Sequence, residues 1–241
     1  AFLIAKSGRP GHVLVDIPKN VQQATYEYEE KPVVEKMPLP KVKEELIEQA
    51  AALVNGAKRP YIYIGGGAAG FFLAVNLKER AADAEVCIFE KSRKVLAKVE
   101  ISGGGRCNCT NSFAEVSDLK TVYPRGDKLM KRLMKVFSHK DAYRWFEERG
   151  VPLVTQEDQC VFPKSQDSHS IINCLTAYAH RLGVKVMRSC SCTSIAPDGE
   201  GFSLTFKTEE GTRTERFDKV AVTTGGSPQR KGLEWLEKLG H

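Results

Sequence analysis

The sequence predicts a three-layer α/β fold of the Rossmann type, with a parallel sheet that also carries a β-hairpin or meander. An apolar, β-prone segment at 61–64 runs directly into Gly65, Gly67 and Gly70, in the pattern G-x-G-x-x-G, and an apolar helix follows. A second apolar segment, 84–90, ends on Glu90, 20 residues after Gly70. This order of strand, glycine turn, helix and acidic strand end is typical of dinucleotide-binding folds.

Each glycine of the pattern serves a different physical need. Gly65 lets the chain turn sharply out of the strand, and Gly67, which has no Cβ, lets a pyrophosphate approach the backbone. Gly70 lets the helix lie close to the sheet, and the N–H groups at the helix start suit phosphate oxygens. We expect Glu90 to accept a pair of ribose hydroxyls. The alternative is a plain glycine-rich turn followed by a surface glutamate.

Composition describes an ordinary globular chain. Of 241 residues, 41% are hydrophobic and 27% are charged, and no apolar run reaches the roughly 20 residues of a membrane span. The first residues lack the features of a signal peptide, so we expect a cytoplasmic protein with reduced cysteines. The seven cysteines include two C-x-C pairs, 107/109 and 190/192, whose spacing is not that of a zinc site. We expect no metal.

The net charge of +6 is modest and spread along the chain. The densest basic stretch, 128–140, alternates with apolar residues in the manner of an amphipathic helix with a solvated face. No aromatic platform or groove-reading motif accompanies it, so we expect no nucleic-acid partner.

Turn signals and periodicity divide the chain into an N-terminal segment, 1–59, and a domain, 60–241. The first segment has a buried strand at 13–17, a linker at 21–40 and a helix at 41–55. In the second we expect helices at 127–137 and 139–149, two short strands within 151–163, and a helix capped by Asp167 or Ser168 that ends near 182. The remaining predicted elements are a parallel core strand at 184–187, a strand at 191–195, a hairpin of 202–206 with 212–217, a strand at 218–224 that returns to the sheet, and a short helix at 233–239.

The N-terminal segment has a resemblance of its own. The string Gly8-Arg-Pro-Gly-His-Val-Leu-Val-Asp-Ile-Pro-Lys-Asn20, a linker and a helix precede Ala57-Lys-Arg-Pro-Tyr-Ile-Tyr-Ile-Gly-Gly-Gly67. Residues 1–64 resemble the large subunit of acetolactate synthase, a thiamine-diphosphate enzyme. The motifs with which that family activates thiamine and binds its diphosphate do not occur in the chain, so the resemblance implies a fragment.

Residues 65–241 resemble a different family, the bacterial NAD(P)/FAD-dependent oxidoreductases related to aminoacetone oxidase. The strings that carry this resemblance are Gly65-Gly-Gly-Ala-Ala-Gly-Phe-Phe72, Ile101-Ser-Gly-Gly-Gly-Arg-Cys-Asn-Cys-Thr-Asn111, Val161-Phe-Pro163 and Thr224-Gly-Gly-Ser227. One departure is Gln159-Cys160, where many members have Gly-Arg. The two resemblances meet at 65–67, which suggests a chimeric chain. The family continues with a cap domain and a final glycine-bearing strand, so the resemblance also implies a C-terminal truncation.

The resemblance implies FAD as cofactor. Spacing alone would allow Glu90 to bind an NAD ribose equally well, and it is the string at 102–108 that favours FAD. The implied cofactor-binding residues are Gly65, Gly67, Ala68, Ala69, Gly70, Glu90, Lys91, Lys98, Ser102, Gly103, Gly104, Gly105, Arg106, Asn108, Cys192, Thr224, Gly225 and Gly226. In this set the glycines at 103–105 form an N–H-lined concavity, Arg106 adds a forked cation, and Cys192 contributes only its backbone.

Three functional hypotheses follow. The first is a flavoprotein oxidoreductase module that passes hydride between flavin and NAD(P)H or a small organic substrate, with activity reduced or absent in a truncated chain. The second is a fragment of a thiamine-diphosphate enzyme, and the third is a folded fusion without cofactor. No histidine, tyrosine or lysine can be assigned to proton transfer from the sequence, and the substrate and oligomeric state stay open.

Overall fold

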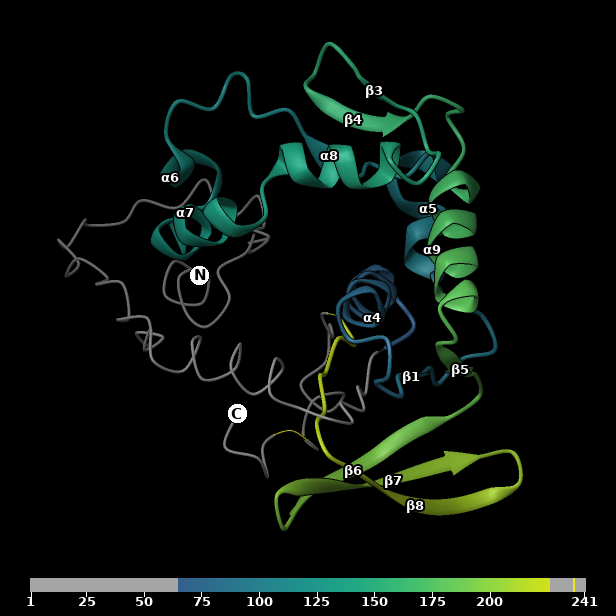
Figure 1. Ribbon diagram of the computed structural model, residues 1–241. Coiled ribbons are helices and arrows are strands. Elements are labelled where there is room, and N and C mark those ends of the chain that lie inside the picture. Colours follow the sequence, from purple (N-terminus) through teal and green to yellow (C-terminus); the bar gives the residue numbers. More distant parts are fainter. Residues whose placement is uncertain (1–64, 226–235, 237–241) are drawn as a thin grey trace, which may run out of the picture. The chain divides into compact units, whose positions relative to one another are not determined.

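The computed structural model describes residues 65–225 and residue 236 (Figure 1). The chain divides into two units, 1–52 and 53–241, and every described residue belongs to the second. The predicted strands at 13–17 and 61–64, the linker at 21–40, the helix at 41–55 and Gly226 lie outside the described residues, as does nearly all of the predicted helix at 233–239.

The described elements are helices, one 3-10 turn and strands. In chain order they are α4 (Ala68–Arg80), β1 (Cys87–Phe89), α5 (Ala97–Ile101), the 3-10 turn η1 (Ser102–Gly105), β2 (Thr110–Asn111), α6 (Leu119–Val122), α7 (Asp127–Val136), α8 (His139–Glu147), β3 (Leu153–Thr155), β4 (Cys160–Pro163), α9 (His169–Arg181), β5 (Lys185–Met187), β6 (Ser191–Asp198), β7 (Gly201–Thr208) and β8 (Gly211–Phe217).

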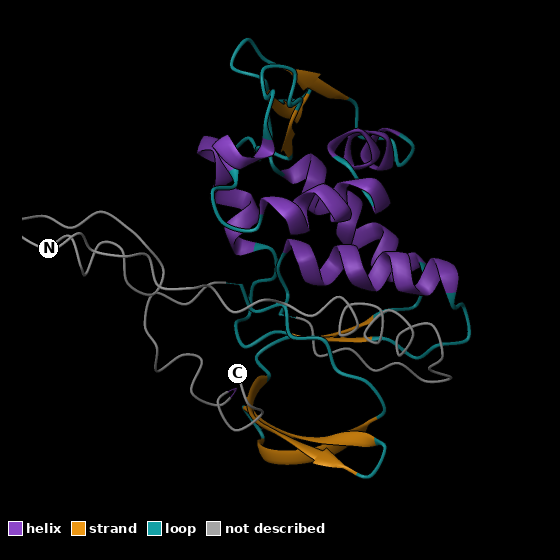
Figure 2. Cartoon of the chain, turned by 90° about the vertical axis from the view of Figure 1, so that its left-hand side faces the viewer, coloured by secondary structure: helices purple, strands orange, loops and turns teal. Residues whose placement is uncertain are grey.

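These elements form three layers around β1 and β5. The two strands pair in parallel, with Ile88 opposite Val186. Figures 1 and 2 show helices on one side of this pair and the antiparallel sheet β6–β7–β8 on the other. A third, small sheet of order β2–β4–β3 lies beside α8. The predicted three-layer α/β class is confirmed, including the parallel strands and the antiparallel meander.

The alternation of side chains along β1 builds two cores. Val86 and Ile88 face the helices and join the core that contains Phe71 of α4 and Leu175 of α9. Cys87 and Phe89 face the opposite way.

The second core lies between β1 and the antiparallel sheet. The ring of Phe89 stacks on that of Phe206 with centroids 4.3 Å apart, and Phe217 meets both rings edge-on. Leu204 and Phe206 are fully buried here. The three-residue strand β1 therefore contributes buried side chains to the cores on both of its faces.

Helix α8 is attached to α4 by polar and aromatic contacts. The indole Nε1 of Trp145 donates to Asn76 Oδ1 at 3.1 Å, and Phe72 packs against the same ring. The guanidinium of Arg149 binds the Glu79 carboxylate with both oxygens, at 2.7 and 2.8 Å, and lies over the Trp145 ring. These contacts hold the layer that supports the glycine turn.

Most predicted elements are found within a residue or two of their expected ends, and two expectations need correction. The strand β5 is parallel, as predicted, but Lys185 and Met187 are exposed, so it is not a core strand. The described residues 218–225 form no strand. The cap of α9 comes from Asp167, whose carboxylate accepts from His169 N at 2.9 Å, while the side chain of Ser168 makes no capping bond.

Within the described residues, no helix combines the length and the apolar character that a membrane crossing requires.

Helix α8 begins with a reciprocal capping box that offers a stability test. Ser138 Oγ accepts from Asp141 N, and Asp141 Oδ2 accepts from Ser138 N at 2.8 Å. We expect Ser138→Ala to lower the free energy of unfolding by about 1 kcal/mol, because an N–H at the helix start loses its acceptor. Urea titration followed by circular dichroism measures this change. Ser138→Thr keeps the hydroxyl and should stay near the wild-type value, and an unchanged alanine variant would contradict the prediction.

Candidate functional site

The start of α4 leaves room for a ligand beside Gly67. This residue is the N-cap of the helix in an extended conformation, and the first bond within the helix runs from Phe71 N to Gly67 O. A Cβ added at Gly67 would meet no atom within 4 Å, and Ala68 and Ala69 are exposed. The start of α4 is therefore accessible at the place where an anion would meet a helix N-terminus, while Gly67 N itself donates to Gly65 O at 2.7 Å.

The two preceding glycines are crowded. A Cβ on Gly65 would lie 2.9 Å from Thr224 Cα, and one on Gly66 would lie 2.8 Å from Glu90 Cβ. Thr223 Oγ1 also donates to Gly65 O at 3.4 Å. Gly65 and Gly66 are thus required by close backbone packing, whereas Gly67 is the glycine that faces outward. Gly70 is buried within α4.

Glu90 lies at the end of β1, against the glycine turn. Its Oε2 accepts from Gly66 N at 2.8 Å, and its Oε1 accepts from the backbone N and the Oγ of Ser92, at 2.9 and 2.7 Å. The carboxylate is thereby held beside the start of α4. Gly66 and Ser92 are not among the predicted cofactor-binding residues, although a serine two residues after the acidic strand end was a usable signal. Lys91 is exposed next to Glu90.

Helix α5 connects the glycine turn to the second glycine segment. Leu96 N donates to Gly66 O at 2.6 Å, and five helical residues later the chain enters η1. At 1.5 Å per residue the helix spans roughly 8 Å, a distance comparable with part of a dinucleotide. Lys98 on α5 reaches toward Gly225, with its Nζ 3.8 Å from the position of an added Cβ there. Both 65–67 and 223–225 therefore lie close to α5.

The loop Gly103–Gly105 has three successive left-handed residues, with φ of 56°, 68° and 85°. Residues other than glycine rarely adopt this backbone conformation. A Cβ on Gly103 would clash with Asn108 N and the Phe162 ring, both at 2.8 Å, whereas one on Gly104 would meet nothing within 4 Å. Position 104 thus has free space beside the loop, whereas a side chain at position 103 would collide with its neighbours.

The predicted cation at this loop is engaged with the protein. Arg106 Nε donates to Gly103 O at 3.1 Å, and its Nη1 donates to Gln156 and Gln166 at 3.3 and 3.2 Å. Its guanidinium lies 4.1 Å from the centroid of the Phe162 ring. Ser102 Oγ donates to Val99 O at 2.8 Å, and Asn108 is exposed beside Gly103.

Cys192 is set apart from this group. It pairs with Phe206 in the antiparallel sheet and belongs to the core between that sheet and β1. Burial raises the pKa of its thiol to about 11. The side chain is therefore a protonated core thiol, while the predicted backbone contact to a cofactor stays a prediction.

The pair Cys107 and Cys109 differs from the other thiols. Cys107 is buried with a left-handed φ of 63°, and its N–H donates to Ser102 O at 2.9 Å. A hydrogen bond from the Cys109 thiol outweighs burial and, with one from Ser102, lowers the pKa of Cys107 to about 7. The same bond, together with burial, raises the pKa of Cys109. Of the two thiols beside the glycine loop, Cys107 is thus the one that ionises first.

The arrangement is that of a dinucleotide-binding Rossmann domain. Residues 59–241 match the family described as HI0933-like protein Rossmann domain, which is more than half of the chain, and the chain belongs to this family.

A curated relative over the same part of the chain is a 3-dehydro-bile acid delta(4,6)-reductase of Clostridium scindens. It is 25% identical over 184 residues, which cover 74% of this chain and 43% of the relative. A second similarity, to acetolactate synthase isozyme 1 large subunit of Escherichia coli, is 56% identical over 68 residues, or 28% of this chain and 12% of that protein. The chain spans less than half the length of these curated relatives.

Solved structures agree on the fold. A 3-ketosteroid-delta4-(5alpha)-dehydrogenase from Rhodococcus jostii superposes with a TM-score of 0.53 at 14% identity, covering 73% of this chain and 47% of that one. THI4 of Thermovibrio ammonificans superposes with a TM-score of 0.51 at 13% identity, covering 83% of this chain and 71% of that one. At these identities the likeness concerns the fold alone.

The lowered pKa of the Cys107 thiol leads to a pH-dependent prediction. Because the pKa of Cys107 is lowered to about 7, a thiolate should form as the pH rises through 7. We expect Cys107→Ser to remove that step from an ultraviolet thiolate titration. Cys192→Ser is the control, since its pKa of about 11 places its own step far above neutrality. A titration without any thiolate near neutral pH in the wild type would contradict the prediction.

Proposed function

We propose that the chain binds FAD along the glycine turn, α5 and the Gly103–Gly105 loop, as a module for flavin-dependent oxidoreduction. The observation that supports this most directly is the open space at Gly67, at the start of a helix whose first residues, Ala68 and Ala69, are exposed. The crowded neighbours Gly65 and Gly66 hold that opening in place. When bound, FAD supplies the hydride and electron chemistry, and the chain's residues position it.

We assign the residues as follows. The N–H groups of the first turn of α4 that follow Gly67, with the Gly103–Gly105 loop, bind the diphosphate. Glu90 binds the ribose next to the first strand, and Lys91 and Lys98 add positive charge nearby. Thr224 and Gly225 close the site from the returning chain, with Gly226 following them.

The second substrate is proposed from the class alone. NAD(P)H or a small organic molecule would exchange hydride with the flavin. Among the described residues, no contact directs a proton donor toward the opening at Gly67. We therefore assign no catalytic residue. We place the protein in the cytoplasm, because all seven cysteines are free thiols.

The N-terminal part is proposed to be a fragment of a different enzyme joined to this module. The match to acetolactate synthase covers 28% of the chain, and the match to the bile-acid reductase covers 74%. A thiamine-diphosphate function would need parts of that enzyme beyond the matched 12%.

The function is tested by the ligand content of the purified full-length chain. We expect visible flavin absorbance, as purified or after incubation with FAD and desalting, and release of FAD identified by mass. Retention of thiamine diphosphate in place of FAD would favour the alternative function. A colourless protein that takes up neither compound would contradict both.

Gly67→Ala separates the cofactor role from a folding role. The new methyl group meets no protein atom, so stability should be unchanged, but it occupies the space assigned to the diphosphate. We expect the Kd for FAD, measured by quenching of flavin fluorescence, to rise at least about tenfold, or about 1.4 kcal/mol.

Gly150→Ala is the matched control for this variant. A Cβ there also meets nothing within 4 Å, but the residue has a φ of 79°, so the variant should lose about 1 kcal/mol of stability and keep its affinity for FAD. Wild-type affinity in Gly67→Ala would remove this glycine from the proposed site.

A further inference from the structure

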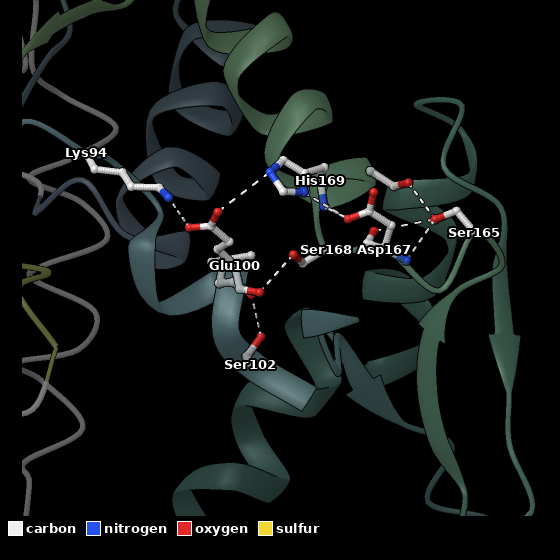
Figure 3. Close-up of polar contacts among 9 residues, drawn as sticks. Lys94, Glu100, Ser102, Ser165, Asp167, Ser168 and His169 are labelled. Carbon is white, nitrogen blue, oxygen red and sulfur yellow. Dashed lines mark hydrogen bonds and ion pairs between the residues drawn. The ribbon is translucent and has the colours of Figure 1, made fainter. Parts of the chain in front are cut away.

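Among the residues that the structure describes, Ser168 is the one buried residue with a polar side chain, with 1% of its surface exposed. It lies just before α9, yet its hydroxyl does not cap that helix. Its Oγ donates to Glu100 O at 2.9 Å (Figure 3), and its backbone N donates to Gly105 O, also at 2.9 Å. One residue thus holds both ends of the segment 100–105, which includes the glycine loop.

Arg106 restrains the middle of the same segment. Its Nε donates to Gly103 O, and its guanidinium is held over Phe162 by stacking and by two glutamine side chains. Cys107 N donates to Ser102 O. The carbonyl oxygens of 100, 102, 103 and 105 are therefore all bonded to donors of the protein.

This pattern matters because a peptide loop can present either its oxygens or its N–H groups to a ligand. Carbonyl oxygens repel a diphosphate, whereas N–H groups attract it. Three left-handed glycines have many accessible conformations in the absence of restraints, and ordering them on binding would weaken affinity. A loop whose carbonyl oxygens are already bonded to the protein avoids that loss of affinity.

We propose that Ser168 and Arg106 are positioning residues of the cofactor site, which hold the carbonyl oxygens of the Gly103–Gly105 segment toward the protein so that its N–H side meets the diphosphate. The proposal rests on the proposed FAD function. Neither side chain needs to touch the cofactor. Arg106 acts through its geometry at Gly103 O and not through its charge.

The polar groups around Ser168 hold its backbone in place. Asp167 accepts from His169 N and contacts the His169 ring at Nδ1, 2.9 Å in each case. His169 Nε2 lies 3.7 Å from Glu100 Oε1, and Glu100 also pairs with Lys94 (Figure 3). The start of α9 is therefore connected to α5 through side chains as well as through Ser168.

Two variants test the proposal in the full-length chain, with the Kd for FAD as the first readout and the unfolding midpoint of the FAD-free protein as the second. We expect Ser168→Ala to raise the Kd about tenfold. Ser138→Ala, which removes a helix cap away from the loop, is the stability-matched control and should change the Kd less than about twofold. Equal effects of the two variants on Kd would reduce Ser168 to a stability residue and overturn the proposal.

Arg106→Lys provides the second variant, since it does not depend on a buried site. Lysine keeps the charge but loses the Nε–H and the planar stacking on Phe162. We expect a rise in Kd of about tenfold, together with a changed visible circular dichroism spectrum of the bound flavin. Wild-type Kd and spectrum in this variant would show that charge suffices and would overturn the assignment of Arg106.

The outcomes separate the two proposals. A wild-type chain that takes up no FAD contradicts the proposed function, and the positioning role falls with it. A wild-type chain that binds FAD, with both variants binding equally well, contradicts the positioning role alone.

Discussion

The backbone N–H and C=O groups of Gly66 join three parts of the molecule. Its N–H donates to Glu90 at the end of β1, and its carbonyl accepts from Leu96 at the start of α5. A side chain at this position would clash with Glu90 and Val95. The absence of a Cβ therefore allows the strand end, the glycine turn and α5 to meet, and these are the elements from which the proposed site is built.

The site combines a rigid support with an open surface. Phe89 and Ile88 anchor β1 in two separate cores, so the strand end that carries Glu90 is held from both faces. On the outer side, positions 67 and 104 have free space where a Cβ would stand. A nucleotide site requires this combination, because affinity is lost when the binding groups must first be ordered.

Local patterns predicted much of this structure. The spacing of the glycines and Glu90 correctly indicated a Rossmann-type domain, since each glycine answers a backbone requirement that is visible within a few residues. Amphipathic periodicity located α7, α8 and α9, and alternation located the β7–β8 hairpin. The same patterns misjudged β5, because an apolar segment reads as buried even where its neighbours leave Met187 exposed. They also misjudged 218–225, where close contact with Gly65 occurs without strand geometry.

Sequence alone determined the fold class, the outward-facing glycine at 67 and the acidic residue at the strand end, because these depend on spacing along one short stretch of chain. Only the tertiary structure decided how the second glycine loop is held. Ser168 meets Glu100 across 68 positions, and Arg106 meets Gln166 across 60. No period or motif encodes such a pairing, since the partners are brought together by tertiary packing such as that of α9 against α5. Of the two candidate caps of α9, Asp167 caps the helix, and the hydroxyl of the buried Ser168 instead bonds the carbonyl of Glu100 in α5.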